Sequence, residues 1–219
     1  APLGLTFGGG TALAFLESSD PDIPTRLWTY DHALGAPTEH TLGWNHDNYS
    51  SLDPDTQNLV SFVCYDATWA DGAFWLACLD GKMVRWEPGN RNARVYVPGR
   101  REVYPIGSFP DLGDTTAAFP DTANRVVAVA AENAGGDSIT LWVAALHRVW
   151  SVAPGDTLWD TTSTVCADTD LHPREFLDIH VNSTTADRSE LFASVVVESK
   201  QDEIDTSLFK YDFTKRHWV

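Results

Sequence analysis

The chain has 219 residues, 43% of them hydrophobic, which is enough for one large all-β domain with a sizeable core. Its formal net charge of −16 repels the phosphate backbone of nucleic acids and the anionic surface of membranes. No run of eighteen apolar residues is present to span a bilayer. We therefore expect no nucleic acid partner and no membrane partner, and the acidity mainly favours solubility.

Short stretches of strand-forming residues, separated by turn residues, follow one another along the whole chain. In chain order the predicted strands cover residues 3–7, 11–16, 25–31, 38–44, 59–65, 74–78, 83–87, 94–97, 115–119, 125–131, 138–144, 147–152, 157–160, 176–181, 190–198, 207–212 and 216–219. Residues 73–97 are the clearest part, because Asp80-Gly81 and Pro88-Gly89-Asn90 are typical turn sequences between strands. Helical periodicity of useful length is absent, so the sequence predicts an all-β fold.

An aromatic residue recurs at a similar place in successive groups of strands. Tyr30, Trp86, Trp150 and Tyr211 follow one another at intervals of 56, 64 and 61 residues. Each interval holds about four predicted strands and begins with a strand of small and branched residues. This pattern is typical of β-propeller blades, in which small residues fit the crowded axis and aromatic residues pack between neighbouring blades.

The repeat predicts a single small β-propeller domain over residues 1–219, with four four-stranded blades at approximately 1–50, 51–110, 111–170 and 171–219. The strand at 3–7 is expected to close the ring by pairing with the last blade. A ring of five blades is one alternative, which requires regular strands in residues 104–119 and 157–167. A β-sandwich is the other.

The three cysteines do not have the spacing of a zinc site. Cys64 and Cys78 lie symmetrically about Asp71-Gly72, a turn sequence, so they are expected to face each other across a hairpin. Two outcomes remain open: a Cys64–Cys78 disulfide with Cys166 free, or three buried thiols. The sequence lacks an initiator methionine and a signal-like apolar segment, so we expect a mature secreted protein or a trimmed chain. Asn48 and Asn182 are N-glycosylation acceptors, which agrees with secretion.

Signals for an enzyme, a metal or a cofactor are weak. The chain has no GxSxG elbow, no HExxH and no phosphate-binding loop. Three histidines fall within fifteen residues but are spread over a strand and two loops, namely His32, His40 and His46. We therefore expect no metal and no cofactor. Asp178 and His180 share one strand face near Glu175, and an enzyme with its active site in the central funnel would use these groups for acid–base chemistry.

The signal for ligand binding lies in the first copy of the repeat. Arg26 opens the aromatic strand, Glu39 opens the next strand, and Trp44 ends it. Two antiparallel strands would bring a guanidinium, a carboxylate and aromatic rings onto one surface. A sugar needs such groups, because charged side chains bind its hydroxyls and a ring stacks on its C–H face.

Residues 11–44, TALAFLESSDPDIPTRLWTYDHALGAPTEHTLGW, resemble one repeat of the fungal fucose-specific propeller lectins. In that family an Arg, a Glu and an aromatic residue hold the sugar between blades, and the ring has six blades on a longer chain. The resemblance implies that Arg26, Glu39 and Trp44 bind the sugar and that Trp28 or Tyr30 packs beside them. The second copy offers a related set, although its next strand has Arg94 in place of Glu: Arg85 and Trp86.

The sequence thus favours a secreted, non-enzymatic, lectin-like protein that binds a glycan or another small polar ligand. The first alternative is a protein-interaction propeller. Six of the fifteen Lys and Arg residues fall between Lys82 and Arg101, and they would form its contact surface. The second alternative is the funnel enzyme.

Overall fold

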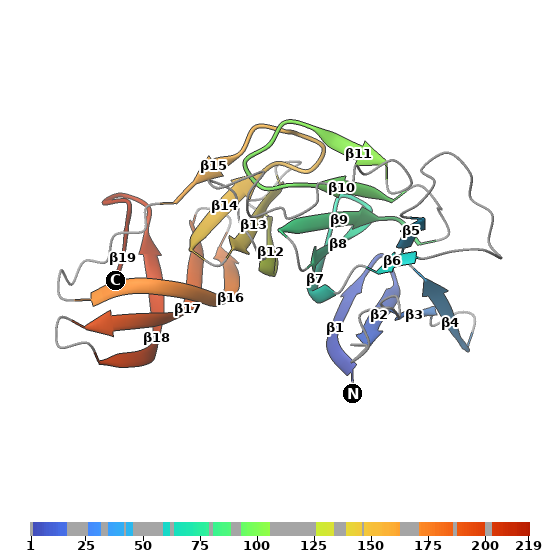
Figure 1. Ribbon diagram of the computed structural model, residues 1–219, viewed down its shortest axis with the longest axis horizontal. Helices are drawn as coiled ribbons and strands as arrows, with labels where there is room; N and C mark the ends of the chain where they lie inside the picture. Colours follow the sequence, from blue (N-terminus) through green and yellow to red (C-terminus); the bar gives the residue numbers. More distant parts are fainter. Residues whose placement is uncertain are drawn as a thin grey trace.

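The computed structural model describes residues 2–16, 26–31, 35–41, 43–45, 59–61, 64–78, 81–88, 93–105, 126–133, 139–145, 147–162, 171–185, 188–199 and 203–219. Every regular element in these ranges is a β-strand, which confirms the all-β prediction. The strands form four antiparallel sheets of four or five strands each, in which strands follow one another in sequence order, and one short two-stranded ribbon (Figure 1).

The sheets are numbered here from the N-terminus. The first sheet consists of β1 (Pro2–Gly8), β2 (Thr11–Leu16), β3 (Arg26–Asp31) and β4 (Pro37–Thr41). The second consists of β7 (Cys64–Ala70), β8 (Ala73–Cys78), β9 (Lys82–Trp86), β10 (Arg94–Tyr96) and β11 (Val103–Pro105). The third consists of β12 (Val126–Asn133), β13 (Ile139–Ala145), β14 (Arg148–Val152) and β15 (Asp160–Thr161). The fourth consists of β16 (Leu171–Thr185), β17 (Arg188–Ser199), β18 (Ile204–Asp212) and β19 (His217–Trp218). The ribbon pairs β5 (Gly43–Asn45) with β6 (Leu59–Ser61).

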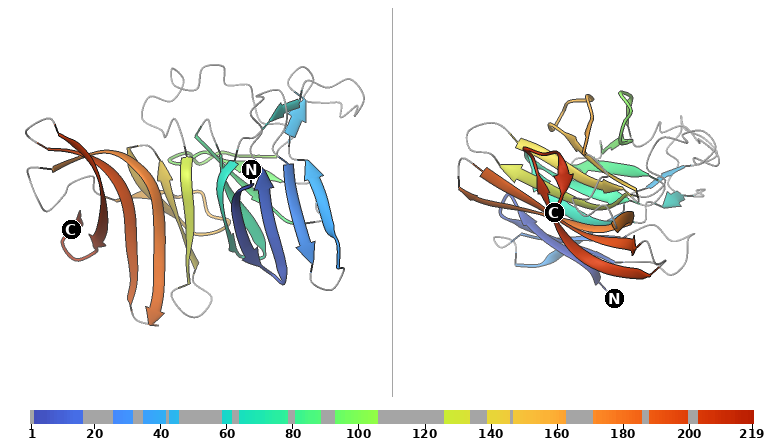
Figure 2. Two further views of the ribbon diagram at one scale, coloured as in Figure 1. Left: turned by 90° about the horizontal axis from the view of Figure 1, so that it is seen from below. Right: turned by 90° about the vertical axis from the view of Figure 1, so that its left-hand side faces the viewer.

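The first strand of each sheet connects the sheets into a series. β1 contacts β7, β7 contacts β12, and β12 contacts β16. Figure 2 shows the four sheets following one another in this order. Within the described ranges no comparable contact joins β16 back to β1. The N-terminal strand was expected to pair with the last blade; instead β1 pairs with β2 in the first sheet.

Turn chemistry explains the two hairpins at the start of the second sheet. Asp71 and Gly72 both have positive φ, at 48° and 70°, which a two-residue hairpin turn requires when its twist matches that of the strands. The turn at Gly81, with φ of 68°, then leads from β8 into β9. Both hairpins were predicted from the sequence and are confirmed, although the strand predicted at 59–65 is divided between β6 and β7, and β7 continues to Ala70.

Elsewhere the strand boundaries differ from the prediction. The strand expected at 38–44 is divided between β4 and β5, which belong to different sheets. β11 lies in a segment that was expected to be a loop. β16 begins at Leu171, five residues before the predicted start. The strand predicted at 115–119 lies outside the described residues.

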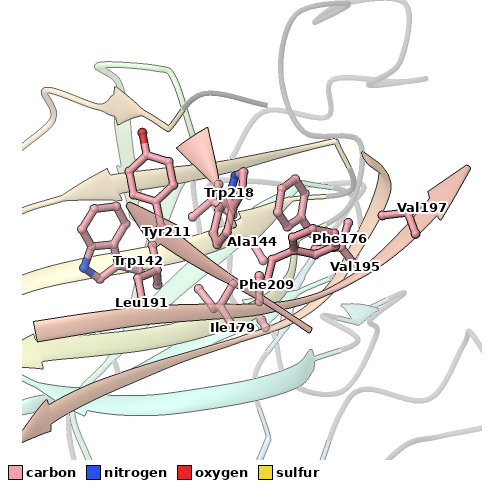
Figure 3. Packing of buried hydrophobic residues seen from close by; sticks show 13 residues of the cluster. Trp142, Ala144, Phe176, Ile179, Leu191, Val195, Val197, Phe209, Tyr211 and Trp218 are labelled. Atoms are coloured by element: carbon pink, nitrogen blue, oxygen red, sulfur yellow. The ribbon is translucent and has the colours of Figure 1, made fainter. Parts of the chain in front are cut away.

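Three hydrophobic clusters fill the spaces between successive sheets. Leu13 and Leu27 of the first sheet pack with Phe74, Leu76 and Trp86 of the second. The second and third sheets share a cluster that includes Trp75, Met83, Leu141, Val143 and Trp150. The third and fourth share one that includes Trp142, Val149, Phe176, Phe209 and Trp218 (Figure 3). The aromatic residues therefore pack mainly between sheets, as the sequence pattern predicted.

Gly8 allows the first and second sheets to approach each other. A Cβ atom at Gly8 would overlap the indole of Trp69, which packs against the cluster between these sheets. The indole is also held edge-on to Phe74, with 4.7 Å between ring centroids. No room exists for a methyl group unless β1 moves away from β7.

We expect Gly8→Ala to lower the free energy of unfolding by about 2–3 kcal/mol, because overpacking forces the two sheets apart. Gly10→Ala is the matched control. Gly10 has φ of +80° with nothing near its Cβ position, so that change adds only backbone strain of about 1 kcal/mol. Urea unfolding measures both. Equal losses for the two variants would contradict the packing role of Gly8.

Cys64 and Cys78 face each other as the sequence predicted. They are register partners on β7 and β8, and both side chains are buried. Their sulfur atoms lie 2.7 Å apart. The disulfide itself stays a prediction, and Cys166 lies outside the described residues.

Under oxidising conditions we expect a Cys64–Cys78 disulfide that stabilises the fold by about 3 kcal/mol, the value for closing a loop of this length. Thiol titration of the denatured, unreduced protein should then find one thiol, whereas the reduced protein should show all three. Three thiols in both samples would mean that the pair stays reduced. Cys64→Ser should abolish the difference in stability between the two samples.

Candidate functional site

A hollow of about 430 Å³ lies where the first strands of the second, third and fourth sheets meet. Its polar side chains come from β7 and β16: Asp66, Thr68, Asp178 and His180. Its apolar lining comes from all three strands and includes Ala67, Val129, Ala130, Ile179 and Val181. The described residues therefore combine carboxylates, an imidazole and a hydroxyl with small hydrophobic surfaces.

Asp66 connects two sheets at this site. Its Oδ2 accepts a hydrogen bond from the Val129 N–H of β12 at 2.9 Å, and its Oδ1 accepts one from the Ala67 N–H at 2.8 Å. The register of β7 against β8 shifts between Cys64 and Asp66, and such a bulge changes the direction of a side chain on an edge strand. The carboxylate is thereby directed to the backbone of the neighbouring sheet.

Burial raises the pKa of Asp66 to about 6 from its usual value of 3.8. The hydrogen bonds from the Val129 and Ala67 N–H groups oppose this rise, and the negative charge of Asp178 adds to it. Near neutral pH the carboxylate is mostly ionised. It is a strong hydrogen-bond acceptor whose two oxygens each keep a lone pair after the backbone bonds are made.

Asp178 and His180 lie on the same face of β16, as the sequence predicted. Their register partners on β17 are Ser194 and Phe192. Both side chains are exposed, and Asp178 Oδ1 accepts a hydrogen bond from the Ile179 N–H at 2.8 Å. Glu175, the third residue of the funnel hypothesis, does not line the hollow.

Sequence reasoning missed Asp66. The predicted strand ended at residue 65, so Asp66 was placed in a connection instead of in β7. A signal was available, because Asp66 is the one charged residue in CYDATWA, the sequence of β7. A lone carboxylate in a strand that is otherwise suited to burial indicates a specific partner.

The residues of the predicted sugar site are partly brought together. Trp28 and Glu39 are register partners on β3 and β4, and Arg26, two residues before Trp28, occupies a position on the same face. Glu39 is exposed, while Trp28 is half-buried and its Nε1 has no hydrogen-bond partner among the described residues. Trp44 is on β5, in the separate two-stranded ribbon.

Arg85 and Trp86, the predicted set of the second copy, point to opposite faces of β9. Arg85 forms an ion pair with Glu87, donates to the Asp71 carbonyl at 3.1 Å, and lies 5.8 Å from the centre of the Trp75 ring. Trp86 is only 3% exposed and stacks on Phe74 in the core. The two residues do not form one surface.

Of the three histidines that fall within fifteen residues in the sequence, the structure describes only one. His32 and His46 lie outside the described residues, and His40 is on β4. Among residues whose side chains are described, no three His, Cys, Asp or Glu groups are arranged to hold a metal ion. The same part of the chain contains no helix long and apolar enough to cross a membrane.

Comparisons with known proteins do not assign the chain to a family. No protein-family model matches the chain, and no curated protein matches it. Among solved structures, the chain is similar to the computationally designed Ika4 protein, with 11% sequence identity, coverage of 94% of this chain and 90% of that chain, and a TM-score of 0.40.

The raised pKa of Asp66 predicts how stability changes with pH. Because the folded-state pKa is about 6 and the usual value is 3.8, the folded protein binds the Asp66 proton more tightly than the unfolded chain does. Lowering the pH from 7.5 to 5 should therefore stabilise the wild type relative to Asp66→Asn. Melting temperatures of both proteins across this pH range test the prediction, and Asp205→Asn, at an exposed residue of β18, is the control. If the melting temperature of the wild type does not rise relative to that of Asp66→Asn as the pH falls, the raised pKa of Asp66 is contradicted.

Proposed function

We propose that the four sheets are blades of a β-propeller type and that the protein binds a small carbohydrate without chemical turnover. The fold proposal is supported by the sequential strand order in every sheet and by the series of contacts between first strands. In a propeller the first strands line the axis. The hollow at β7, β12 and β16 would then be an axial binding site.

The convergence of Asp66, Asp178 and His180 on this hollow carries the functional proposal. Carboxylates accept hydrogen bonds from pairs of sugar hydroxyls, and an imidazole can donate or accept one. The partly exposed side chains of Ala130 and Val181 offer a small apolar surface for the C–H groups of a sugar ring. A volume of about 430 Å³ lies in the usual range for small-molecule sites of about 300–1,000 Å³.

The outer face of the first sheet is the second candidate for the sugar. Arg26, Trp28 and Glu39 occupy positions on one face, and within the part of the chain that the structure describes the Trp28 Nε1 group lacks a hydrogen-bond partner. This set corresponds to the residues implied by the lectin resemblance. The first sheet offers aromatic surface for stacking, whereas the hollow offers two carboxylates and an imidazole.

A glycan array with the wild type identifies the ligand, and titration calorimetry with variants locates the site. Asp178→Asn should weaken binding about tenfold or more, since a hydrogen bond to a charged group contributes about 1.5–3 kcal/mol. The matched control Asp205→Asn should bind normally. Loss of binding in Glu39→Gln but not in Asp178→Asn would move the site to the first sheet. No sugar binding by the wild type would overturn the function.

We also propose that the protein is secreted. The facing positions of Cys64 and Cys78 are compatible with an oxidising compartment. Asn182 of the predicted glycosylation acceptor lies on β16 and is partly exposed, while Asn48 lies outside the described residues.

A further inference from the structure

The two end sheets each have one face that no other described sheet covers. The second and third sheets share clusters with a neighbour on either side, whereas the first and fourth sheets each share only one. Among the residues whose burial is described, nine large hydrophobic ones are exposed, and the strand registers place five of them on the two uncovered faces: Leu5, Phe7, Tyr30, Ile204 and Leu208. Such a concentration marks an interaction surface.

Strand register identifies the uncovered face of the first sheet. Leu13 and Leu27 point toward the second sheet and are completely buried. Phe7 and Tyr30 are both register partners of Ala12, one residue before Leu13, so they point to the other side. Phe7 is 69% exposed and Tyr30 44%.

The fourth sheet also has one covered and one uncovered face, but its covered face packs against the preceding sheet. Phe209 and Tyr211 of β18 belong to the cluster shared with the third sheet. Leu208 is 70% exposed, and Ile204 on the same face is 72% exposed. Lys210 also lies on this face, where it forms an ion pair with Glu190.

The repeat shows what kind of surface covers Tyr30. Its counterparts in the later copies are Trp86, Trp150 and Tyr211, which are 3%, 8% and 5% exposed. Each belongs to the cluster shared with the preceding sheet. Tyr30 alone has no preceding sheet. The second and third sheets each use one face to cover the corresponding aromatic residue of the next sheet. In the fourth sheet this face is uncovered.

We propose that the uncovered face of the first sheet binds the uncovered face of the fourth sheet in a second copy of this chain. The contact would continue the sheet-to-sheet packing that occurs three times within the chain. It is heterologous, since two different faces meet. Two copies that make it reciprocally form a closed dimer in which neither kind of face remains exposed.

Light scattering after gel filtration tests the proposal on the whole chain. The wild type should have twice the 24.1 kDa mass of one chain at micromolar concentration. Tyr30→Glu and Leu208→Glu should each yield monomers, because each damages both contacts of the dimer. Leu158→Glu, at a 60% exposed residue outside both faces, should stay dimeric. Circular dichroism confirms that the variants are folded, and a monomeric wild type would overturn the proposal.

Mixing the two monomeric variants tests the head-to-tail arrangement. The intact fourth sheet of Tyr30→Glu can meet the intact first sheet of Leu208→Glu, so the mixture should form a dimer that neither variant forms alone. Its dissociation constant should be at least tenfold weaker than that of the wild type, since one of the two contacts is lost. A mixture that stays monomeric would overturn the pairing of these two faces. Glycan binding at the hollow does not involve these two faces, so that proposal and the dimer can fail independently, whereas a sugar bound at Trp28 and Glu39 would compete with the dimer for the uncovered face of the first sheet.

Discussion

The hydrogen bond from the Val129 N–H to Asp66 is the interaction on which the site depends. First strands are edge strands within their own sheets, so their outward backbone groups lack a ladder partner. Asp66 supplies one of these partners from the neighbouring sheet. The bond holds β7 beside β12, and the hollow exists because β16 lies on the far side of β12. The same bond explains why a carboxylate is tolerated in a place that raises its pKa.

Packing on both faces explains the composition of the inner sheets. All six residues of β8 are buried, and they are apolar without alternation. A strand in a sheet that is covered on both faces needs a continuous run of apolar residues, whereas a strand with one solvent-exposed face alternates apolar and polar residues. Phe74 and Leu76 belong to one cluster and Trp75 and Ala77 to the other, so successive side chains stabilise different interfaces. The high tryptophan content is thereby largely a requirement of packing between sheets.

The fold was predictable to the extent that local chemistry determines it. Asp71-Gly72 fixed one hairpin of the second sheet through its positive φ values, and the spacing of Tyr30, Trp86, Trp150 and Tyr211 located four sheets. The site was less accessible, because Asp66 and Asp178 are 112 positions apart and meet only through the order of the sheets. The split between β4 and β5 was also hidden, since the choice between two sheets depends on tertiary contacts.

The sequential order of strands has a consequence for folding. Each sheet forms by pairing between strands that are neighbours in the chain, and face packing together with a few hydrogen bonds such as that from the Val129 N–H to Asp66 links one sheet to the next. Such a molecule behaves as a nearly one-dimensional array, in which local opening spreads inward from its ends. Amides of β8 and β13 belong to units supported on two sides, and those of β3 and β18 to units supported on one. Protection from hydrogen exchange is thus graded along the array, highest in the middle.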